Sequence, residues 1–289
     1  KPVLICSPMM AGDLSYHLEQ IVLLVRRLVL AGPGLSVATV PMLRGVWGAA
    51  LHQLDQAAYG KVFRPPATNS GESVPLYVLR PATTADGRPA IDWISIGPAL
   101  DHDAILLRAW LEATRMGLGP QRLPFTVESV GFLAPHSRPE EPWSLNSIAP
   151  GLDPDQPWQI TFTTPLRLRR KGLLIERPTL VDIIVAATRR IYSYLTDQPE
   201  VWVGIKEQAL VEARATPASP WVGQRLDLRR YSGSQKAELE MRGVSGSLTL
   251  PVGPGKLWPW LEAARWLHLG SGTVFGMGQV LISRPELQP

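Results

Sequence analysis

Apolar residues along the first half of the chain follow strand and helix spacings in turn. The run 21–30 (IVLLVRRLVL) is short, rich in β-branched residues and followed by AGPG, which favours a strand. Residues 40–63 place apolar side chains at helical spacing, and Pro41 suits the first turn of a helix. Segments 74–81 and 90–97 then predict two strands joined by a turn that contains the sequence ADG.

A second helix and a last strand complete this half. The segment 99–119 has helical spacing, with Asp101 as the expected N-cap and Gly117 or Gly119 at the expected end. The run 125–133 (FTVESVGFL) reads as a strand. The first half therefore predicts the order β-α-β-β-α-β.

The same order recurs after a segment rich in Pro, Ser and Asn, residues 134–158. Such a composition is typical of a connection between domains, so we expect two domains, 1–150 and 151–289. The second half predicts, in order, a strand with an extension at 158–175, a helix at 179–197 with Thr179 as N-cap, a hairpin at 226–251, a helix at 257–270 and a strand at 278–283.

The repeated order indicates an α+β fold class with two tandem ferredoxin-like domains. A four-stranded sheet of this kind is also the platform with which many small RNA-binding domains of the RRM type hold single-stranded RNA.

The composition is that of a globular protein. Hydrophobic residues make up 45% and charged residues 19% of the 289 residues, and the mean hydropathy is +0.02. No apolar run reaches the roughly 18 to 20 residues that cross a bilayer, because Arg26 and Arg27 interrupt the strongest candidate. The N-terminus lacks a secretory pattern, so a cytoplasmic protein is expected. A single cysteine, Cys6, excludes an intramolecular disulfide and a cysteine zinc cluster, and we expect no metal or cofactor.

Positive charge is concentrated in the second half. Residues 1–150 carry no net charge, so the whole formal charge of +4 lies in 151–289. Seven basic residues fall within 165–190: Arg167, Arg169, Arg170, Lys171, Arg177, Arg189 and Arg190. A GC-rich coding sequence would also raise the arginine content, but a basic patch in one half is typical of a nucleic-acid-binding surface.

The stretch HLGSGTVFGMGQV, residues 268–280, contains glycines at Gly270, Gly272, Gly276 and Gly278. It follows a helix and precedes a strand, so it is not the strand-to-helix loop of a dinucleotide site. No G-K-[ST] tripeptide is present for a Walker loop, and GVSGS at 243–247 does not fit a hydrolase elbow. Either its backbone approaches a phosphate chain closely, or it is a tight turn without a ligand.

Four stretches together resemble a known family. WLHLGSGTVFGMGQV is similar to the C-terminal glycine-rich signature of the CRISPR repeat-processing endoribonucleases of the RAMP superfamily. PMLRGVWGAAL at 41–51, TTPLRLRRKGLL at 163–174 and DLRRYSGSQKAELEMRGVSGSLTL at 227–250 resemble, in the right order, the first helix, the strand opening the second domain, and the hairpin before the last helix. The resemblance spans about residues 20–283.

The resemblance implies a CRISPR repeat RNA as substrate and partner, and metal-independent cleavage by the ribose 2′-hydroxyl. The products would be a 2′,3′-cyclic phosphate and a 5′-hydroxyl. It implies a general base on the first helix, where His52 lies, with Tyr59 and Lys61 at the helix end as the assisting phenol and cation. The alternative for His52 is a solvated histidine on the helix surface.

The basic residues and the glycine stretch are the candidate RNA-binding groups. Arg167, Arg169, Arg170 and Lys171 lie on a strand and its turn, Arg229, Arg230 and Lys236 lie on the hairpin, and His268 opens the glycine stretch. We expect phosphate contacts from the two basic groups, and expect His268 to order the loop or to contact RNA. Solvated strand ends are the alternative for the arginines.

Three functions remain open at this point. The first is the endoribonuclease that matures CRISPR RNA. The second is the same fold without strong catalysis, as an RNA-binding module of a larger CRISPR complex or a domain fused to a reverse transcriptase or integrase. The fused-domain alternative rests on the first residues, KPVLIC, which lack an initial Met, and on the last residues, RPELQP, as expected for a fragment of a longer polypeptide. The third is a structural pair of domains with no RNA role. No membrane partner is expected.

Overall fold

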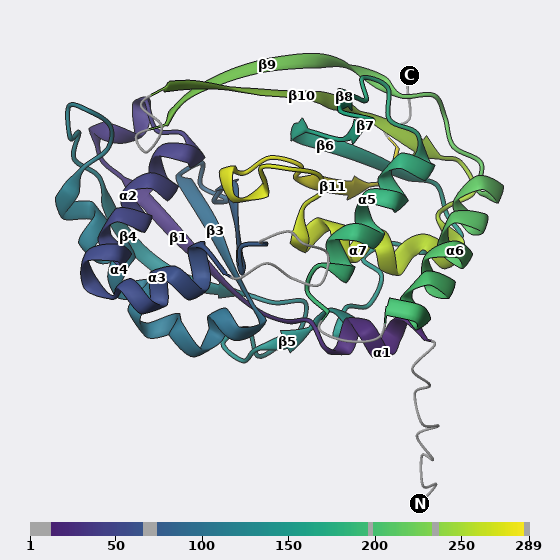
Figure 1. Ribbon diagram of the computed structural model, residues 1–289, viewed down its shortest axis with the longest axis horizontal. Helices are drawn as coiled ribbons and strands as arrows, with labels where there is room; N and C mark the ends of the chain where they lie inside the picture. The colour runs from purple at the N-terminus through teal and green to yellow at the C-terminus, as the bar shows by residue number, and fades with distance from the viewer. Residues whose placement is uncertain (1–12, 66–73, 196–198, 233–236, 286–289) are drawn as a thin grey trace, which may run out of the picture.

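The computed structural model describes residues 13–65, 74–195, 199–232 and 237–285, and within 228–241 it describes the strand backbone only. Two antiparallel sheets organise the molecule, and Figure 1 shows the first sheet with its helices on the left and most of the second half on the right.

The first half forms one sheet with its helices. Its elements are β1 (Val22–Ala31), α2 (Val40–Leu54), α3 (Gln56–Phe63), β2 (Tyr77–Thr83), β3 (Pro89–Ile96), α4 (Asp103–Met116) and β4 (Thr126–Leu133). The strand order is β2-β3-β1-β4, with every neighbouring pair antiparallel. Helices α2 and α4 pack against each other.

The second half repeats this arrangement. Its main elements are β6 (Trp158–Leu166), α5 (Leu180–Tyr192), β9 (Val222–Ser232), β10 (Ala237–Leu250), α7 (Trp258–Leu267) and β11 (Val280–Ser283). Read in reverse, the strand order β11-β6-β10-β9 runs second, third, first and fourth strand of its half, as β2-β3-β1-β4 does in the first sheet. The predicted tandem ferredoxin-like fold is therefore confirmed.

Several local predictions need correction. The helix expected over 40–63 is broken at Asp55, which ends α2 and accepts a 2.9 Å hydrogen bond from the Ala58 N–H at the start of α3. Asp101 is not an N-cap, because a 3-10 turn, η2 (Gly97–His102), leads into α4. Thr179 caps α5 as predicted, in a capping box with Asp182.

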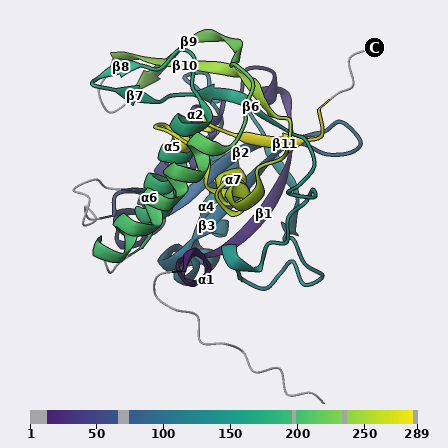
Figure 2. The ribbon, with the colours of Figure 1, turned by 90° about the vertical axis from the view of Figure 1, so that its right-hand side faces the viewer.

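The structure adds elements that the spacing did not indicate. These are α1 (Leu14–Glu19), α6 (Pro199–Ala215) and the small hairpin of β7 (Arg169–Arg170) and β8 (Leu173–Leu174). Short 3-10 turns are η1 (Pro33–Ser36), η3 (Leu145–Ser147), η4 (Gly255–Leu257) and η5 (Thr273–Phe275). Helix α5 packs on both α6 and α7, and Figure 2 shows these three helices together.

The segment expected to connect two domains is itself packed. Within it, β5 (Trp143–Ser144) pairs with the start of β1, and Trp143 is buried with its ring 4.8 Å from that of Trp266 on α7. One hydrophobic cluster includes Val25 and Ile94 of the first sheet together with Ile160 and Leu261 of the second half. The two halves therefore share a core, which fixes their relative position.

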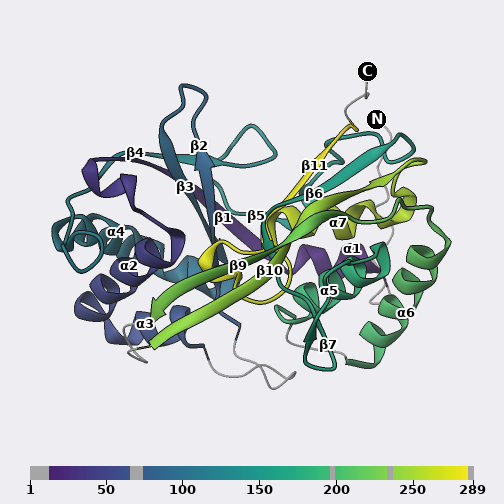
Figure 3. The ribbon, with the colours of Figure 1, turned by 90° about the horizontal axis from the view of Figure 1, so that it is seen from above.

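The β9–β10 ribbon extends beyond its sheet. Strand β10 pairs with β6 only over Val244–Leu250, so residues 237–243 pair with β9 alone. Figures 1 and 3 show this ribbon passing from the second half over the first.

Candidate nucleic-acid interface

The glycine stretch forms a loop that is fastened to the end of β6. After α7, the Leu269 N–H donates to the Gly278 carbonyl (3.0 Å), and the Gly278 N–H donates to the Pro165 carbonyl (3.0 Å). The Ser271 N–H donates to the Arg167 carbonyl (3.2 Å). These backbone bonds hold the loop between α7, β6 and β11.

The glycines of this loop have a structural reason. All four have φ between +69° and +85°, a region that L side chains rarely adopt. A Cβ at Gly278 would lie 1.9 Å from the Leu269 carbonyl oxygen, and one at Gly270 would lie 2.5 Å from the Arg167 carbonyl oxygen. The turn geometry therefore accounts for the glycines, which by themselves do not indicate a ligand. The pocket that the loop lines is the feature that bears on ligand binding.

His268 is an internal anchor of this loop. Its side chain is fully buried and its Nδ1 lies 3.1 Å from the Met277 carbonyl oxygen, so Nδ1 carries the proton that is donated. Burial, with the positive charges of Arg80 and Arg190, lowers the pKa of His268 to about 3 although its hydrogen bond to Met277 opposes the shift. Of the two expected roles, the geometry favours ordering of the loop over a direct contact with RNA, because no surface of this side chain is exposed.

This burial predicts a pH dependence of stability. The pKa of His268 is about 3 in the folded protein and about 6.5 in the unfolded chain, so the unfolded state takes up the proton first as the pH falls. The contribution of neutral His268 is complete above about pH 6.5 and falls by up to about 1.4 kcal/mol per pH unit toward pH 3. Urea unfolding of wild type and His268→Gln between pH 7 and 4 should show their stability difference shrinking. A constant difference would contradict the assignment.

A pocket of about 500 Å³ opens where this loop meets α5 and the end of β6. Four arginines line it with loop residues 270–274: Arg167, Arg169, Arg189 and Arg190. The Arg190 guanidinium donates to the Gly270 carbonyl (2.5 Å), so it also anchors the loop. The other three arginines surround the cavity.

No carboxylate among the described residues compensates the positive charge in this pocket. Burial lowers the pKa of Arg167, and the nearby positive charges of Arg169 and Arg242 lower it further. Within the part of the chain that the structure describes, Arg167, Arg169 and Arg189 form no ion pair with a carboxylate. A concave site with several unpaired guanidinium groups is suited to phosphate, which they bind in bidentate fashion.

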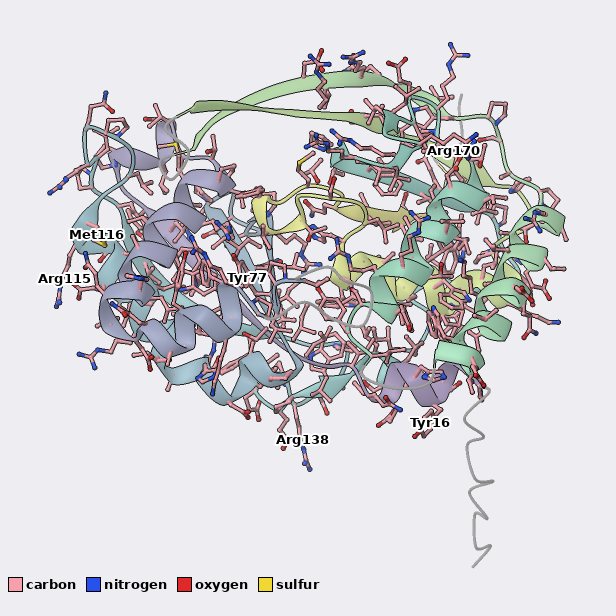
Figure 4. All side chains as sticks on the ribbon, viewed as in Figure 1. Tyr16, Tyr77, Arg115, Met116, Arg138 and Arg170 are labelled. Atoms are coloured by element: carbon pink, nitrogen blue, oxygen red, sulfur yellow. The ribbon has the colours of Figure 1, made fainter. Side chains whose placement is uncertain are left out.

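The other basic candidates have different surroundings. Arg170 pairs with Asp182 at the start of α5, so its charge is neutralised although its side chain is largely exposed (Figure 4). Lys171 lies exposed in the turn between β7 and β8, with φ 50°. Arg229 and Arg230 lie on β9, but their side chains are outside the described part, as is the whole of Lys236.

Arg189 and Arg190 are the pocket residues that sequence reasoning missed as site residues. Both belong to the basic cluster of 165–190, whereas phosphate contacts are predicted from residues 167–171 and from the hairpin. Both lie in the last turn of α5 and line the pocket together with Arg167, which follows β6. The signal in the sequence was the capping box at Thr179, which fixes the start of this helix and so places Arg189 and Arg190 in its last turn.

Two of the three catalytic candidates meet. His52 is exposed near the end of α2, and its ring lies edge-on to that of Tyr59 on α3 at 5.1 Å between centroids. Lys61, two residues beyond Tyr59, points to the opposite side of α3, since two residues turn a helix by about 200°. There it lines a second pocket of about 580 Å³ with His102 and Tyr194. The two pockets share Val74 and Ser193 as lining residues, so they adjoin.

A row of packed side chains joins His52 to the glycine loop. Tyr59 stacks on Phe63 (5.1 Å between centroids), and the Arg44 guanidinium lies 5.2 Å from the Phe63 ring and 4.9 Å from the Phe275 ring of the loop. The candidate base and the loop thus lie at opposite ends of one continuous contact.

Two further features bear on the classes of function. No helix within the described ranges is long and apolar enough to cross a membrane. Those ranges also contain no group of three or more His, Cys, Asp or Glu side chains arranged to hold a metal ion.

Comparison with known proteins finds one family match and several similar solved structures. Residues 160–280 match the family described as CRISPR-associated endoribonuclease Cas6. A Cas6 product complex has a TM-score of 0.59 at 17% identity, covering 92% of this chain and 100% of that one. A second Cas6 product complex scores 0.57 at 21% identity, with coverage of 91% and 99%. A Thermus thermophilus Cas6 structure scores 0.57 at 14% identity, with coverage of 91% and 99%.

No curated protein sequence matches the chain significantly. The structural likenesses, all below 25% identity, establish the fold, and the family match covers the segment that contains β6, α5, the hairpin and the glycine loop. The resemblance found in the sequence is therefore confirmed: this chain has the tandem ferredoxin-like fold of Cas6 proteins, and its residues 160–280 match the CRISPR-associated endoribonuclease Cas6 family.

Proposed function

We propose that the chain is an endoribonuclease that cleaves CRISPR precursor RNA within its repeats. The observation that carries this proposal is the arginine pocket at the glycine loop. Its unpaired guanidinium groups lie inside the segment that matches the Cas6 family. A phosphate chain supplies the charge that this pocket lacks.

The RNA would lie as a strand along the two adjoining pockets. Arg167, Arg169 and Arg189 would contact its phosphates, while the loop backbone at 270–272 would allow close approach. The shared core of the two halves keeps these groups in place before RNA arrives, which lowers the cost of ordering on binding.

The chemistry would be attack by a ribose 2′-hydroxyl. His52 would remove its proton, the 2′-oxygen would bond to the adjacent phosphorus, and the bond to the 5′-oxygen would break as that oxygen takes a proton. The products are a 2′,3′-cyclic phosphate and a 5′-hydroxyl. Because the nucleophile belongs to the RNA, no metal-activated water is needed.

The assisting residues would act from two sides. Tyr59 would position the His52 ring through its edge-on contact. Lys61, in the second pocket, would contact a neighbouring phosphate and not the same one as His52, because it lies on the other side of α3.

Substitution of His52 tests this assignment. His52→Ala is expected to slow cleavage of end-labelled repeat RNA in EDTA by about 10²- to 10⁴-fold under single-turnover conditions, the range for loss of a general base. The dissociation constant should change less than about twofold, since His52 lies outside both pockets. His136→Ala, an exposed histidine that lines neither pocket, is the matched control and should cleave at the wild-type rate. If His52→Ala also cleaves at the wild-type rate, His52 is not the base.

A further inference from the structure

Arg44 is held rigidly at the junction of the two halves. Its Nε donates to the Tyr77 hydroxyl oxygen at 2.7 Å. Its guanidinium lies between three aromatic rings, those of Phe63, Tyr77 and Phe275, at 5.2, 5.9 and 4.9 Å. Cation–π contacts and one hydrogen bond therefore fix the group, and Figure 4 labels its partner Tyr77.

Among the described residues, Arg44 lacks the carboxylate partner that several other arginines of this half have. Arg26 pairs with Asp103, and Arg27 and Arg80 both pair with the buried Asp92. In the described part of the chain no carboxylate pairs with Arg44. Burial raises the pKa of Tyr77, so its phenol stays neutral and does not compensate the charge.

Most of the hydrogen-bonding capacity of Arg44 is also unused. A guanidinium has five N–H donors, and only the one on Nε finds an acceptor among the described residues. The side chain is half-buried, so part of it is open to a ligand. A fixed, partly desolvated cation with free donors binds an anion strongly, because little entropy is lost when the contact forms.

The position of Arg44 relates this cation to the proposed RNA path. It lies on α2, the helix that carries His52, and touches the tip of the glycine loop through Phe275. It therefore lies between the arginine pocket and the candidate base, eight residues or about 12 Å along the helix from His52.

We propose that Arg44 is an RNA-binding residue that contacts one phosphate of the strand where it passes from the glycine loop to His52. This inference rests on the proposed function, since it takes the ligand to be RNA. The contact would fix the strand on the first half of the chain.

The test is the salt dependence of repeat-RNA binding by the full chain, measured by fluorescence anisotropy. Each phosphate contact with single-stranded nucleic acid contributes about 0.7 to the slope of log affinity against log salt. Arg44→Gln should reduce the magnitude of this negative slope by about 0.7. It should also weaken binding about 10-fold or more at low salt. Arg44→Lys keeps the charge and should retain the slope while losing affinity.

Two controls separate this contact from a structural role. Tyr77→Phe removes the Nε hydrogen bond without removing charge, so it should leave the slope unchanged. Arg115→Gln removes an arginine paired with Glu112 at the outer edge of the molecule (Figure 4) and should also leave it unchanged.

A methylphosphonate scan of the RNA gives a second, independent readout. One linkage should matter for wild type and lose its effect in Arg44→Gln. If folded Arg44→Gln and Arg44→Lys both keep the wild-type slope and the same sensitive linkages, the inference is wrong while the proposed function stands. If the wild type itself binds no repeat RNA, the proposed function fails and this inference fails with it.

Discussion

Replacing Arg167 and Arg189 together by glutamine is expected to weaken repeat-RNA binding by about 100-fold or more near 0.1 M salt. Hydrogen bonds to charged groups contribute about 1.5–3 kcal/mol each, which is about 10- to 100-fold per lost contact. The slope of log affinity against log salt is negative, and its magnitude should decrease by about 1.4, or about 0.7 for each of two phosphates.

The same substitution should leave the free energy of unfolding unchanged or raise it. Burial, and after it the positive charges of Arg169 and Arg242, lowers the pKa of Arg167, so loss of its charge relieves both desolvation and repulsion. A site kept for ligand binding at the expense of stability behaves in this way. Urea unfolding and anisotropy on one preparation measure both effects.

The matched control removes the same net charge elsewhere. Arg115 and Arg138 are exposed and paired with Glu112 and Glu141, and both lie at the periphery in Figure 4. Arg115→Gln with Arg138→Gln should change affinity by less than about twofold, since exposed ion pairs contribute about 0–1 kcal/mol. Equal losses for the two double variants would show that only overall charge matters and would contradict a defined phosphate pocket.

Gly278→Ala is expected to destabilise the protein by at least about 3 kcal/mol and to abolish measurable RNA binding. The backbone here has φ +69°, and the added Cβ would lie 1.9 Å from the Leu269 carbonyl oxygen, so the loop has to move. Left-handed backbone alone costs an L residue about 1–2 kcal/mol, and the displaced hydrogen bonds to Leu269 and Pro165 add to this.

Gly87→Ala separates the two costs. Gly87 has φ +84° but no atom within 4 Å of the Cβ site, in the turn between β2 and β3. It should lose only about 1–2 kcal/mol and bind RNA normally. Equal stability losses at Gly87 and Gly278 would mean that the close packing of the glycine loop contributes nothing.

Spacing of apolar residues was sufficient to predict the four main strands of each half and the helices between them, because these elements bury apolar faces against one another. Spacing did not indicate α6, nor the break at Asp55, where the Asp55 side chain caps α3 and α2 ends. The division into domains at 150 and 151 stays a prediction. The shared core and the pairing of β5 with β1 were not visible in a segment rich in Pro and Ser.

The site was predicted in part. Counting charge located the basic cluster, and Arg167 and Arg169 do line a pocket with the glycine loop. Sequence alone could not show that Arg170 is neutralised by Asp182 or that His268 is buried, because both depend on packing between distant elements. Arg44 was hidden in a helical pattern, since only the fold brings Phe63, Tyr77 and Phe275 around it.

Repeat cleavage is tested most directly by the reaction of the purified protein with end-labelled repeat RNA and a scrambled RNA of equal length, both in EDTA. We expect one cut, in the repeat alone, with a 2′,3′-cyclic phosphate on one product and a 5′-hydroxyl on the other. Repeat RNA that binds tightly but stays intact would contradict cleavage and leave a binding module. Cleavage of the repeat and scrambled RNAs to the same extent would contradict repeat processing altogether.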